Sequence, residues 1–401
     1  MLMLKALRDR SIRLLWSGQA LSAIGDEIYR VALIWLAVGL IGADTGYLAA
    51  AQSGALLALC LVGGHWADRW DHRRTMIGVD AARALIVLAP VAAFYMGTVT
   101  LPLLFVVALS LSALSAFFEP ALQATLPDVA PDTETLQAAT GLMSTTVRLA
   151  RAVGPAIVGL LAPFVPTIHF FTLDSASFWV SALSVARLAP STRPARPLRP
   201  RPGFHESLLD GLRAAGRSPL MSDLMLVRAL IGGFWNLSYG LGLALLARAM
   251  APGDMRAFGW AVACYGAGNV GGALWAGNIR RRRPVALACV GYAFLGAGFL
   301  AMGLAPNLFW LGAACALGGF GGPVSDLPFV DLVQKLYPVE DIPKLFRLRM
   351  AAETGAALLL MTASPTLFRD YSPRIVMTAC GAAFSLIAAV FYAARGETAA
   401  A

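Results

Sequence analysis

Three ionisable residues interrupt an apolar stretch near the amino terminus: Asp26, Glu27 and Arg30. On a helix, Arg30 lies one turn from both acids and can pair with either of them. Two acids beside one base leave one carboxylate without a partner, and its proton affinity changes when Arg30 changes partner. We therefore predict that Asp26 or Glu27 couples proton movement to function; the alternative is an ion pair that only neutralises itself. The two acids point about 100° apart on a helix, and the sequence does not choose between them.

Three further arginines lie within apolar stretches. Arg148 and Arg151 share one helix face, and Arg228 lies at moderate depth in a later stretch. The planar guanidinium fork matches the two oxygens of a carboxylate, so these bases predict an anion-binding site. Structural pairing with Glu119 or Asp174 is an equally open alternative. The predicted anion-binding residues are Arg30, Arg148, Arg151 and Arg228.

Acids further along the chain have other predicted roles. Glu353 lies near the middle of its apolar stretch, so it is a second candidate for proton coupling. Glu119 and Asp326 lie nearer the ends of their stretches, beside helix-disrupting prolines such as Pro120. This position favours gate-forming ion pairs over substrate ligands.

For two smaller groups of residues, a structural role competes with a functional one. Asp80 and Arg83 are spaced as an ion pair within one helix, and we predict a structural role for them. Trp235, Asn236 and Tyr239 could line a substrate cavity, although aromatic residues at helical spacing more often pack in a core.

The elements that must hold these residues follow from composition. The chain is 58% hydrophobic and only 14% charged, with a mean hydropathy of +0.67. Soluble domains average about 45–50% apolar and about 25% charged residues. Apolar segments of about 20 residues, enough to cross a bilayer core, recur along the chain. We predict an all-α membrane protein with twelve transmembrane helices, at 14–40, 46–66, 75–97, 101–124, 136–162, 166–188, 220–247, 256–278, 284–304, 307–334, 343–367 and 373–394.

The sequence shows no pattern typical of an enzyme. It contains no catalytic triad, metal-ligand cluster or phosphate-binding glycine loop. Its five cysteines are scattered through apolar runs without paired spacing, which predicts buried thiols. We therefore expect no enzymatic activity, no metal and no cofactor.

The distribution of charge argues against a nucleic-acid partner. The formal net charge is +9, but Lys and Arg gather near the amino terminus and in residues 65–74, 187–217 and 280–283. The intervening loops, such as 41–46 and 97–101, contain neither. Alternating basic and uncharged loops follow the positive-inside rule, which predicts that both termini are cytoplasmic.

The chain divides into two similar parts. A segment rich in proline and arginine predicts a cytoplasmic linker at 190–218, between a six-helix half at 1–189 and another at 219–401. Glu119 corresponds to Asp326, and Pro131 to Pro338, at a near-constant offset. Such pairs indicate two repeats related by an axis along the membrane normal.

A charged turn lies between the second and third predicted spans. Gly64, Asp68, Arg69, Arg73 and Arg74 resemble the loop between the second and third helices of the major facilitator superfamily. The resemblance implies twelve helices working by alternating access, usually exporting against a proton gradient.

The same resemblance implies a cytoplasmic gate. In this family the loop acid, here Asp68, meets the eleventh helix, and the loop arginine, here Arg69, meets an acid at the end of the fourth helix, for which Asp128 is the candidate. The expected gating residues are Asp68, Arg69, Arg73, Asp128, Glu119 and Asp326.

The start of the chain, from Leu15 through Asp26, and the stretches from Asp326 to Gln334 and Arg347 to Met350 resemble the bacterial exporter branch with the enterobactin exporter and macrolide efflux proteins. We therefore expect a proton-coupled exporter in a bacterial inner membrane, with an anionic, siderophore-like metabolite as its substrate. Its expected partners are this small molecule, protons and lipid, and it is expected to act as a monomer. The alternatives are a multidrug or macrolide efflux transporter, a lipid translocator, or a membrane sensor that no longer transports.

Overall fold

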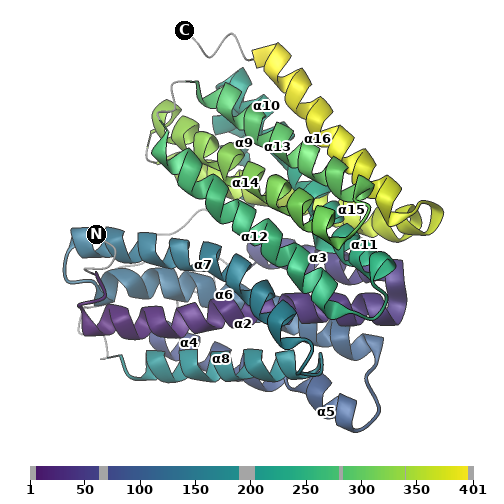
Figure 1. The fold of residues 1–401 in the computed structure, drawn as a ribbon. Coiled ribbons are helices and arrows are strands. Elements are labelled where there is room, and N and C mark those ends of the chain that lie inside the picture. The colour runs from purple at the N-terminus through teal and green to yellow at the C-terminus, as the bar shows by residue number, and fades with distance from the viewer. Residues whose placement is uncertain (1–5, 63–70, 189–203, 280–282, 339, 396–401) are drawn as a thin grey trace. The chain divides into compact units, whose positions relative to one another are not determined.

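The computed structural model describes residues 6–62, 71–188, 204–279, 283–338 and 340–395, which form helices joined by turns and no strand (Figure 1). The chain divides into two compact units. Unit 1 comprises Met1–Leu36 and Ala58–Gly203, and unit 2 comprises Ala37–Leu57 and Phe204–Ala401.

Unit 1 contains most of the first helices of the chain. They are α2 (Arg10–Ile41, whose end belongs to unit 2), α3 (Thr45–Val62, likewise shared), α4 (His72–Ile86), α5 (Ala89–Tyr95), α6 (Leu101–Val129), α7 (Thr133–Leu161) and α8 (His169–Ala186). Asp71 begins α4 by accepting a hydrogen bond from the Arg74 amide, and Asp132 begins α7 by accepting one from the Thr135 amide. Such caps satisfy amides that have no partner inside the helix.

Unit 2 contains the remaining helices. They are the 3₁₀ turn η1 (Gly42–Asp44), α9 (Phe204–Gly216), α10 (Pro219–Trp235), the π-helical turn η4 (Asn236–Gly242), α11 (Leu243–Met250), α12 (Met255–Asn278), α13 (Pro284–Leu304), α14 (Leu308–Leu336), α15 (Ile342–Asp370) and α16 (Pro373–Arg395). In Figure 1, α14 lies beside α12 and α13, and α13 beside α16. Small residues permit this approach: a Cβ on Gly298 would lie 2.3 Å from Cα of Gly318.

The segment 37–57 groups with unit 2 through its own contacts. Asp44 of η1 accepts a hydrogen bond from Arg369 of α15 at 2.5 Å. A Cβ on Gly46 would overlap Oγ of Ser364, so α3 begins in direct contact with α15. The predicted division into halves at 1–189 and 219–401 stays a prediction.

The predicted spans fall on helices, with local differences. The third is divided between α4 and α5, where Pro90 follows the break, and the seventh contains the π-helical turn η4. Seven segments in the described residues are long and apolar enough to cross a membrane: Arg10–Ala58, His72–Tyr95, Leu101–Val129, Pro219–Met250, Pro284–Leu304, Leu308–Leu336 and Pro373–Arg395. The segment Arg10–Ala58 holds two predicted spans, on α2 and α3. The total of twelve spans also needs α7, α8, α12 and α15, which are more polar, and it stays a prediction.

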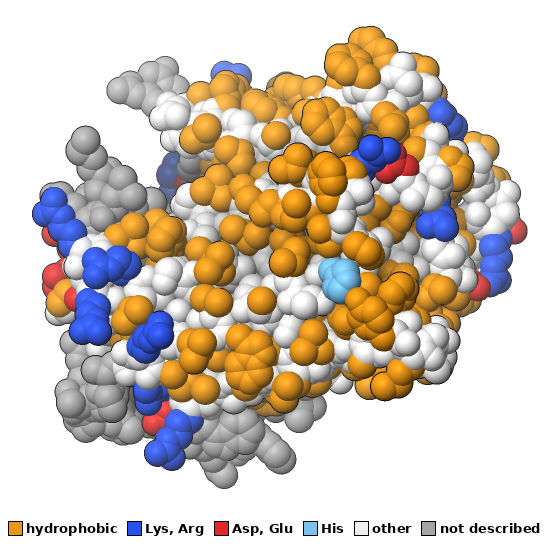
Figure 2. Space-filling model, turned by 60° about the horizontal axis from the view of Figure 1, so that its bottom comes forward, with side chains coloured by type: hydrophobic (Ala, Val, Ile, Leu, Met, Phe, Trp, Pro, Cys, Tyr) orange, Lys and Arg blue, Asp and Glu red, His pale blue; other side chains and the backbone are white. Residues whose placement is uncertain are grey.

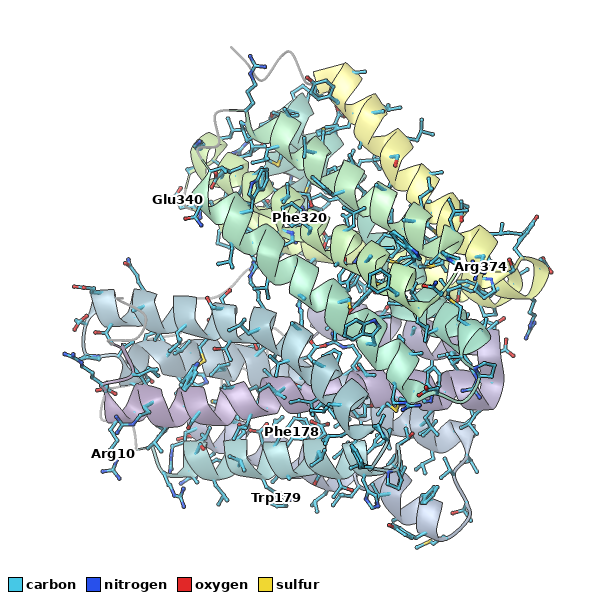
Figure 3. All side chains as sticks on the ribbon, in the orientation of Figure 1. Arg10, Phe178, Trp179, Phe320, Glu340 and Arg374 are labelled. Carbon is cyan, nitrogen blue, oxygen red and sulfur yellow. The ribbon has the colours of Figure 1, made fainter. Side chains whose placement is uncertain are left out.

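The exterior suits a lipid environment. Hydrophobic side chains cover much of the visible surface in Figure 2. On α8 the neighbouring residues Phe178 and Trp179 point to different sides (Figure 3), and Phe178 is buried whereas Trp179 is 41% exposed. An apolar side chain is therefore stable on both the inner and the outer face of this helix.

The predicted linker contains a helix, α9, that is tied to the start of α15. Asp341 accepts hydrogen bonds from Lys344 at 2.6 Å and from Arg217, just after α9, at 2.7 Å. The hydrogen bond from Lys344, helped by that from Arg217, holds the pKa of the Asp341 carboxyl below its usual range.

We expect Asp341→Asn to loosen α9 from α15. Because the folded-state pKa is lowered, this pair stabilises the contact above the ordinary carboxyl pKa of about 3.9 and loses that effect as the pH falls through the lowered value. Hydrogen exchange of the α9 amides at pH 7 should be faster in the variant, whereas wild type should show the same change only in acid. Asp210→Asn, which removes a pair inside α9, is the control. Equal exchange in wild type and Asp341→Asn would contradict this role.

Candidate substrate and proton sites

The first candidate site lies in unit 1 around Glu27 of α2. Glu27 is 7% exposed. Its Oε2 accepts a hydrogen bond from Arg30 at 3.1 Å, and its Oε1 lies 3.9 Å from Nε of Arg151 on α7. The two arginine side chains are 54% and 56% exposed. A buried carboxylate therefore lies between two bases that a ligand can reach.

A glycine sets the distance between α7 and α2 at this site. A Cβ on Gly154 would lie 2.6 Å from Cβ of Glu27 and 3.1 Å from the carbonyl oxygen of Ile24. A larger residue would push the helices apart. Gly154 thus brings Arg151, one turn earlier on α7, within reach of Glu27.

The structure distinguishes the two acids that the sequence left open. Arg30 pairs with Glu27, whereas the strongest electrostatic partner of Asp26 is Arg83 of α4. Neighbouring residues on a helix point about 100° apart, so the two carboxylates face different helices.

The partner of Arg151 also differs from both alternatives considered for it. Neither Glu119 nor Asp174 is its acid; Arg151 lies near Glu27. Arg148 is half-buried one turn earlier on the same helix. The two predicted anion-binding arginines therefore lie one turn apart on α7. Arg151 is the one near Glu27, a predicted coupling acid.

The second candidate site is an ion-pair network in unit 2, formed by Arg228 of α10, Asp326 of α14, and Arg349 and Glu353 of α15. Arg228 contacts Asp326 at 2.6 Å and Glu353 at 3.0 Å, and Arg349 contacts both acids at 2.9 Å. Each acid is thus bonded by both arginines, and the four charges cancel.

Aromatic and small residues hold this unit 2 network. Both guanidinium groups stack on the buried ring of Phe329, at 4.8 Å for Arg228 and 5.0 Å for Arg349. A Cβ on Gly232 of α10 would lie 3.0 Å from Cγ of Glu353, so α10 approaches α15 closely here. The network therefore joins α10, α14 and α15 at one point.

The network unites residues to which the sequence assigned three separate roles. Arg228 was expected to bind substrate, Glu353 to couple protons and Asp326 to form a gate; their contacts place all three in one network. Arg349 was not among the predicted site residues. Its spacing of four residues from Glu353 was a usable signal, because such pairs share a helix face.

The predicted aromatic group is present in unit 2 with an additional member. Trp235 and Tyr239 stack at 4.8 Å between ring centroids, and Tyr265 of α12 lies 4.3 Å from Tyr239. Nε1 of Trp235 donates to the Tyr265 hydroxyl at 2.7 Å. Asn236 instead donates to the carbonyl oxygen of Gly232 in its own helix. The π-helical turn η4 begins at this point, and such turns often occur at functional sites.

The expected gate can be placed only in part. Asp68 and Arg69 lie outside the described residues. Arg73 donates to the carbonyl oxygens of Val185 and Ala186 at the end of α8, where a base is favoured by the helix dipole. Asp128 is exposed near the end of α6.

The two acids related by the repeat have different surroundings. Glu119 is exposed and accepts a hydrogen bond from Gln123 one turn along α6, whereas Asp326 belongs to the unit 2 network. The similarity between the repeats therefore does not extend to the contacts of these acids.

Comparison with known proteins gives both a family match and structural neighbours. A family model described as transmembrane secretion effector matches residues 3–331. The structure of the nucleoside transporter NupG has a TM-score of 0.72 and 14% identity, over 96% of this chain and 98% of that one. A structure of the peptide transporter POT in complex with sulfate has a TM-score of 0.70 and 14% identity, over 98% and 95%. No curated protein matches the chain. The two structures share its fold.

Proposed function

The chain belongs to the transmembrane secretion effector family of the major facilitator superfamily, and we propose that it exports a small anionic molecule by proton-coupled alternating access. Family and fold make it a multi-pass membrane transporter. The proposal adds direction, coupling and substrate. It also includes twelve spans in two six-helix halves, a bacterial inner membrane, cytoplasmic termini and action as a monomer.

The observation that carries the proposal is the position of Glu27 between Arg30 and Arg151. Guanidinium groups bind carboxylate and phenolate oxygens through charge-assisted hydrogen bonds. Each such bond contributes about 1.5–3 kcal/mol. Ionised Glu27 competes with a bound anion for the same two bases, so its charge controls how tightly the anion is held.

This competition fixes the sign of the coupling at Glu27. Protonation of Glu27 releases the arginines and favours anion binding, and a bound anion in turn favours protonation. By itself the site would therefore move anion and proton together. Exchange of an anion for a proton requires a second proton-binding group elsewhere in the protein.

The substrate class follows from the bases of α2 and α7. Arg30, Arg148 and Arg151 favour an oxygen-rich anion such as a carboxylate or catecholate siderophore. Arg228 contributes less than the sequence suggested, because its guanidinium already contacts Asp326 and Glu353.

A second candidate function is the efflux of lipophilic cations or macrolides. It is favoured by the stacked rings of Trp235 and Tyr239 with Tyr265 in unit 2. Aromatic faces attract cations within about 6 Å of the ring centroid. A cation near Glu27 or Glu353 would compete with protons, which is the linkage expected for a drug–proton exchanger.

Binding measurements can distinguish the two substrates. We expect an anionic catecholate siderophore to bind wild type more tightly than a lipophilic cation does. Arg148→Ala with Arg151→Ala should weaken siderophore binding by roughly 100-fold, the loss of about 2.7 kcal/mol, and leave cation binding unchanged. Arg256→Ala, which removes an exposed pair with Asp254, is the matched control. Stronger binding of the cation to wild type, unchanged in the double variant, would exclude the anionic substrate.

A further inference from the structure

A second group of acids lies inside unit 1, on the side of α2 that Asp26 faces. Asp80 of α4 and Asp174 of α8 are fully buried, and Arg83 of α4 is 5% exposed. We call these three residues, with Asp26 and Tyr29 of α2, the buried acid cluster. Asp26 interacts electrostatically with Arg83, and Tyr29 with Asp174 and Asp26.

Arg83 is positioned to form an ion pair with one acid, Asp80. Its NH1 lies 3.5 Å from Oδ1 of Asp80. Its guanidinium lies between the rings of Phe118 on α6, at 4.9 Å, and Phe178 on α8, at 5.3 Å. Figure 3 marks Phe178 on α8. The two rings leave Arg83 little freedom to turn toward another carboxylate.

Within the described residues, Asp174 has no ion pair like the one between Asp80 and Arg83. Oγ of Ser177 lies 3.4 Å from its Oδ1 but donates at 2.8 Å to the Asp174 backbone carbonyl. In the same part of the chain, Oδ2 of Asp174, both carboxylate oxygens of Asp80 and the buried hydroxyl of Tyr29 have no hydrogen-bond partner. A Cβ on Gly25 would lie 2.7 Å from Oδ1 of Asp174, so α2 passes directly over this carboxylate.

The charges that face the cluster do not balance. α2 contributes Asp26, α4 contributes Asp80 and Arg83, and α8 contributes Asp174; the facing residue of α6 is the uncharged Phe118. Two fully buried acids and the half-buried Asp26, with one buried base, give a net charge of about −2, which is costly in a medium of low dielectric constant. The bases next in reach, Arg30 and Arg151, are engaged with Glu27 and largely exposed.

We propose that Asp174 binds a proton and is the second proton-binding group that exchange requires. This inference rests on the proposed function. Loading the proton turns one carboxylate into a neutral acid and breaks no other bond; unloading restores the carboxylate. Asp80 is paired with Arg83, which favours its charged form over that of Asp174. The bound proton lies on the opposite side of α2 from Glu27 and Arg151, so the proton and the anion occupy separate sites that alternating access would have to couple.

A proton fits this place better than a metal cation. A metal would need several oxygen ligands, whereas the space around Arg83 is filled by its own guanidinium and by two phenyl rings. A protonated Asp174 also supplies a donor at Oδ2, where the described residues provide no hydrogen bond to a charged oxygen. Tyr29, whose hydroxyl is buried and which interacts electrostatically with Asp174, is the group of the cluster proposed to accept it.

Two asparagine variants separate a protonated acid from an ionised one. Asparagine resembles a protonated aspartic acid in shape and charge. In the full chain reconstituted in lipid at pH 7, Asp174→Asn should leave Tm unchanged or raise it, whereas Asp80→Asn should lower Tm by at least ~2 °C, because it leaves Arg83 without its acid. An equal fall in Tm for both variants would show that Asp174 is ionised and overturn the proposal.

Infrared spectroscopy tests the proton directly and needs no substrate. Wild type at pH 7 should show the carbonyl stretch of a protonated carboxyl, and Asp174→Asn should lose it. Asp132→Asn is the matched control, since hydrogen bonds from Thr135 hold the pKa of the exposed Asp132 carboxyl below its usual range. Absence of the band in wild type, or its persistence in Asp174→Asn, would refute the site. If the band behaves as expected but transport ignores a proton gradient, the site stands and only the proposed coupling fails.

Discussion

Replacing Glu27 by glutamine is expected to abolish accumulation of the substrate against a gradient while leaving downhill exchange in place. Glutamine keeps the shape of the side chain but cannot become negative, so Arg30 and Arg151 lose their competitor. The anion should then bind more tightly, by on the order of 10-fold, the equivalent of one charge-assisted contact of about 1.4 kcal/mol. Its affinity should also no longer change with pH.

Transport into inverted vesicles, with and without an imposed proton gradient, measures both effects. Glu134→Gln, in the first turn of α7, changes an acid away from Glu27 and is the control. Asp26→Asn serves as a second comparison, because Asp26 interacts more strongly with Arg83 of α4 than with Arg30. If Asp26→Asn and Glu27→Gln both accumulate substrate normally, coupling depends on another acid, such as Asp174 or Glu353.

Much of the helical organisation could be predicted because hydrophobic length is a strong local signal. The ninth span, for example, was predicted at 284–304 and is α13, Pro284–Leu304. Local signals do not report a break that neighbouring helices accommodate. The π-helical turn at Asn236–Gly242 is such a case, since its sequence, including the buried Ser238 and Gly242, also suits an ordinary helix.

The sites were harder to predict because their partners are far apart in the chain. Helical spacing correctly suggested that Arg30 could reach Glu27, but it could not place Arg151 beside the same acid. It also suggested a structural pair at Asp80 and Arg83, and these residues do pair. What spacing could not reveal is Asp174, which comes near this pair because α8 packs on α4, where Ser175 donates to the carbonyl oxygen of Ala84.

The largest effect on stability is expected from Arg228→Met in the unit 2 network. Methionine fills part of the space above Phe329 but leaves Asp326 and Glu353 with Arg349 as the one remaining base of the network as described. The side chain of Arg228 is only 10% exposed. Removing one member of a buried ion pair costs about 3–5 kcal/mol. Because both acids are partly exposed, we expect the lower end, which corresponds to a fall in Tm of roughly 6–12 °C for a unit of this size.

Because the two acids and two bases of the network balance, removing one acid as well should restore part of the stability that Arg228→Met loses. Arg228→Met combined with Glu353→Gln leaves one acid, Asp326, with one base, Arg349, at 2.9 Å. The double variant should therefore be more stable than Arg228→Met alone, so that the two effects are far from additive. Thermal unfolding of wild type, both single variants and the double variant, with Arg256→Met as an exposed control, measures the coupling. Additive losses would mean that the four residues do not act as one network.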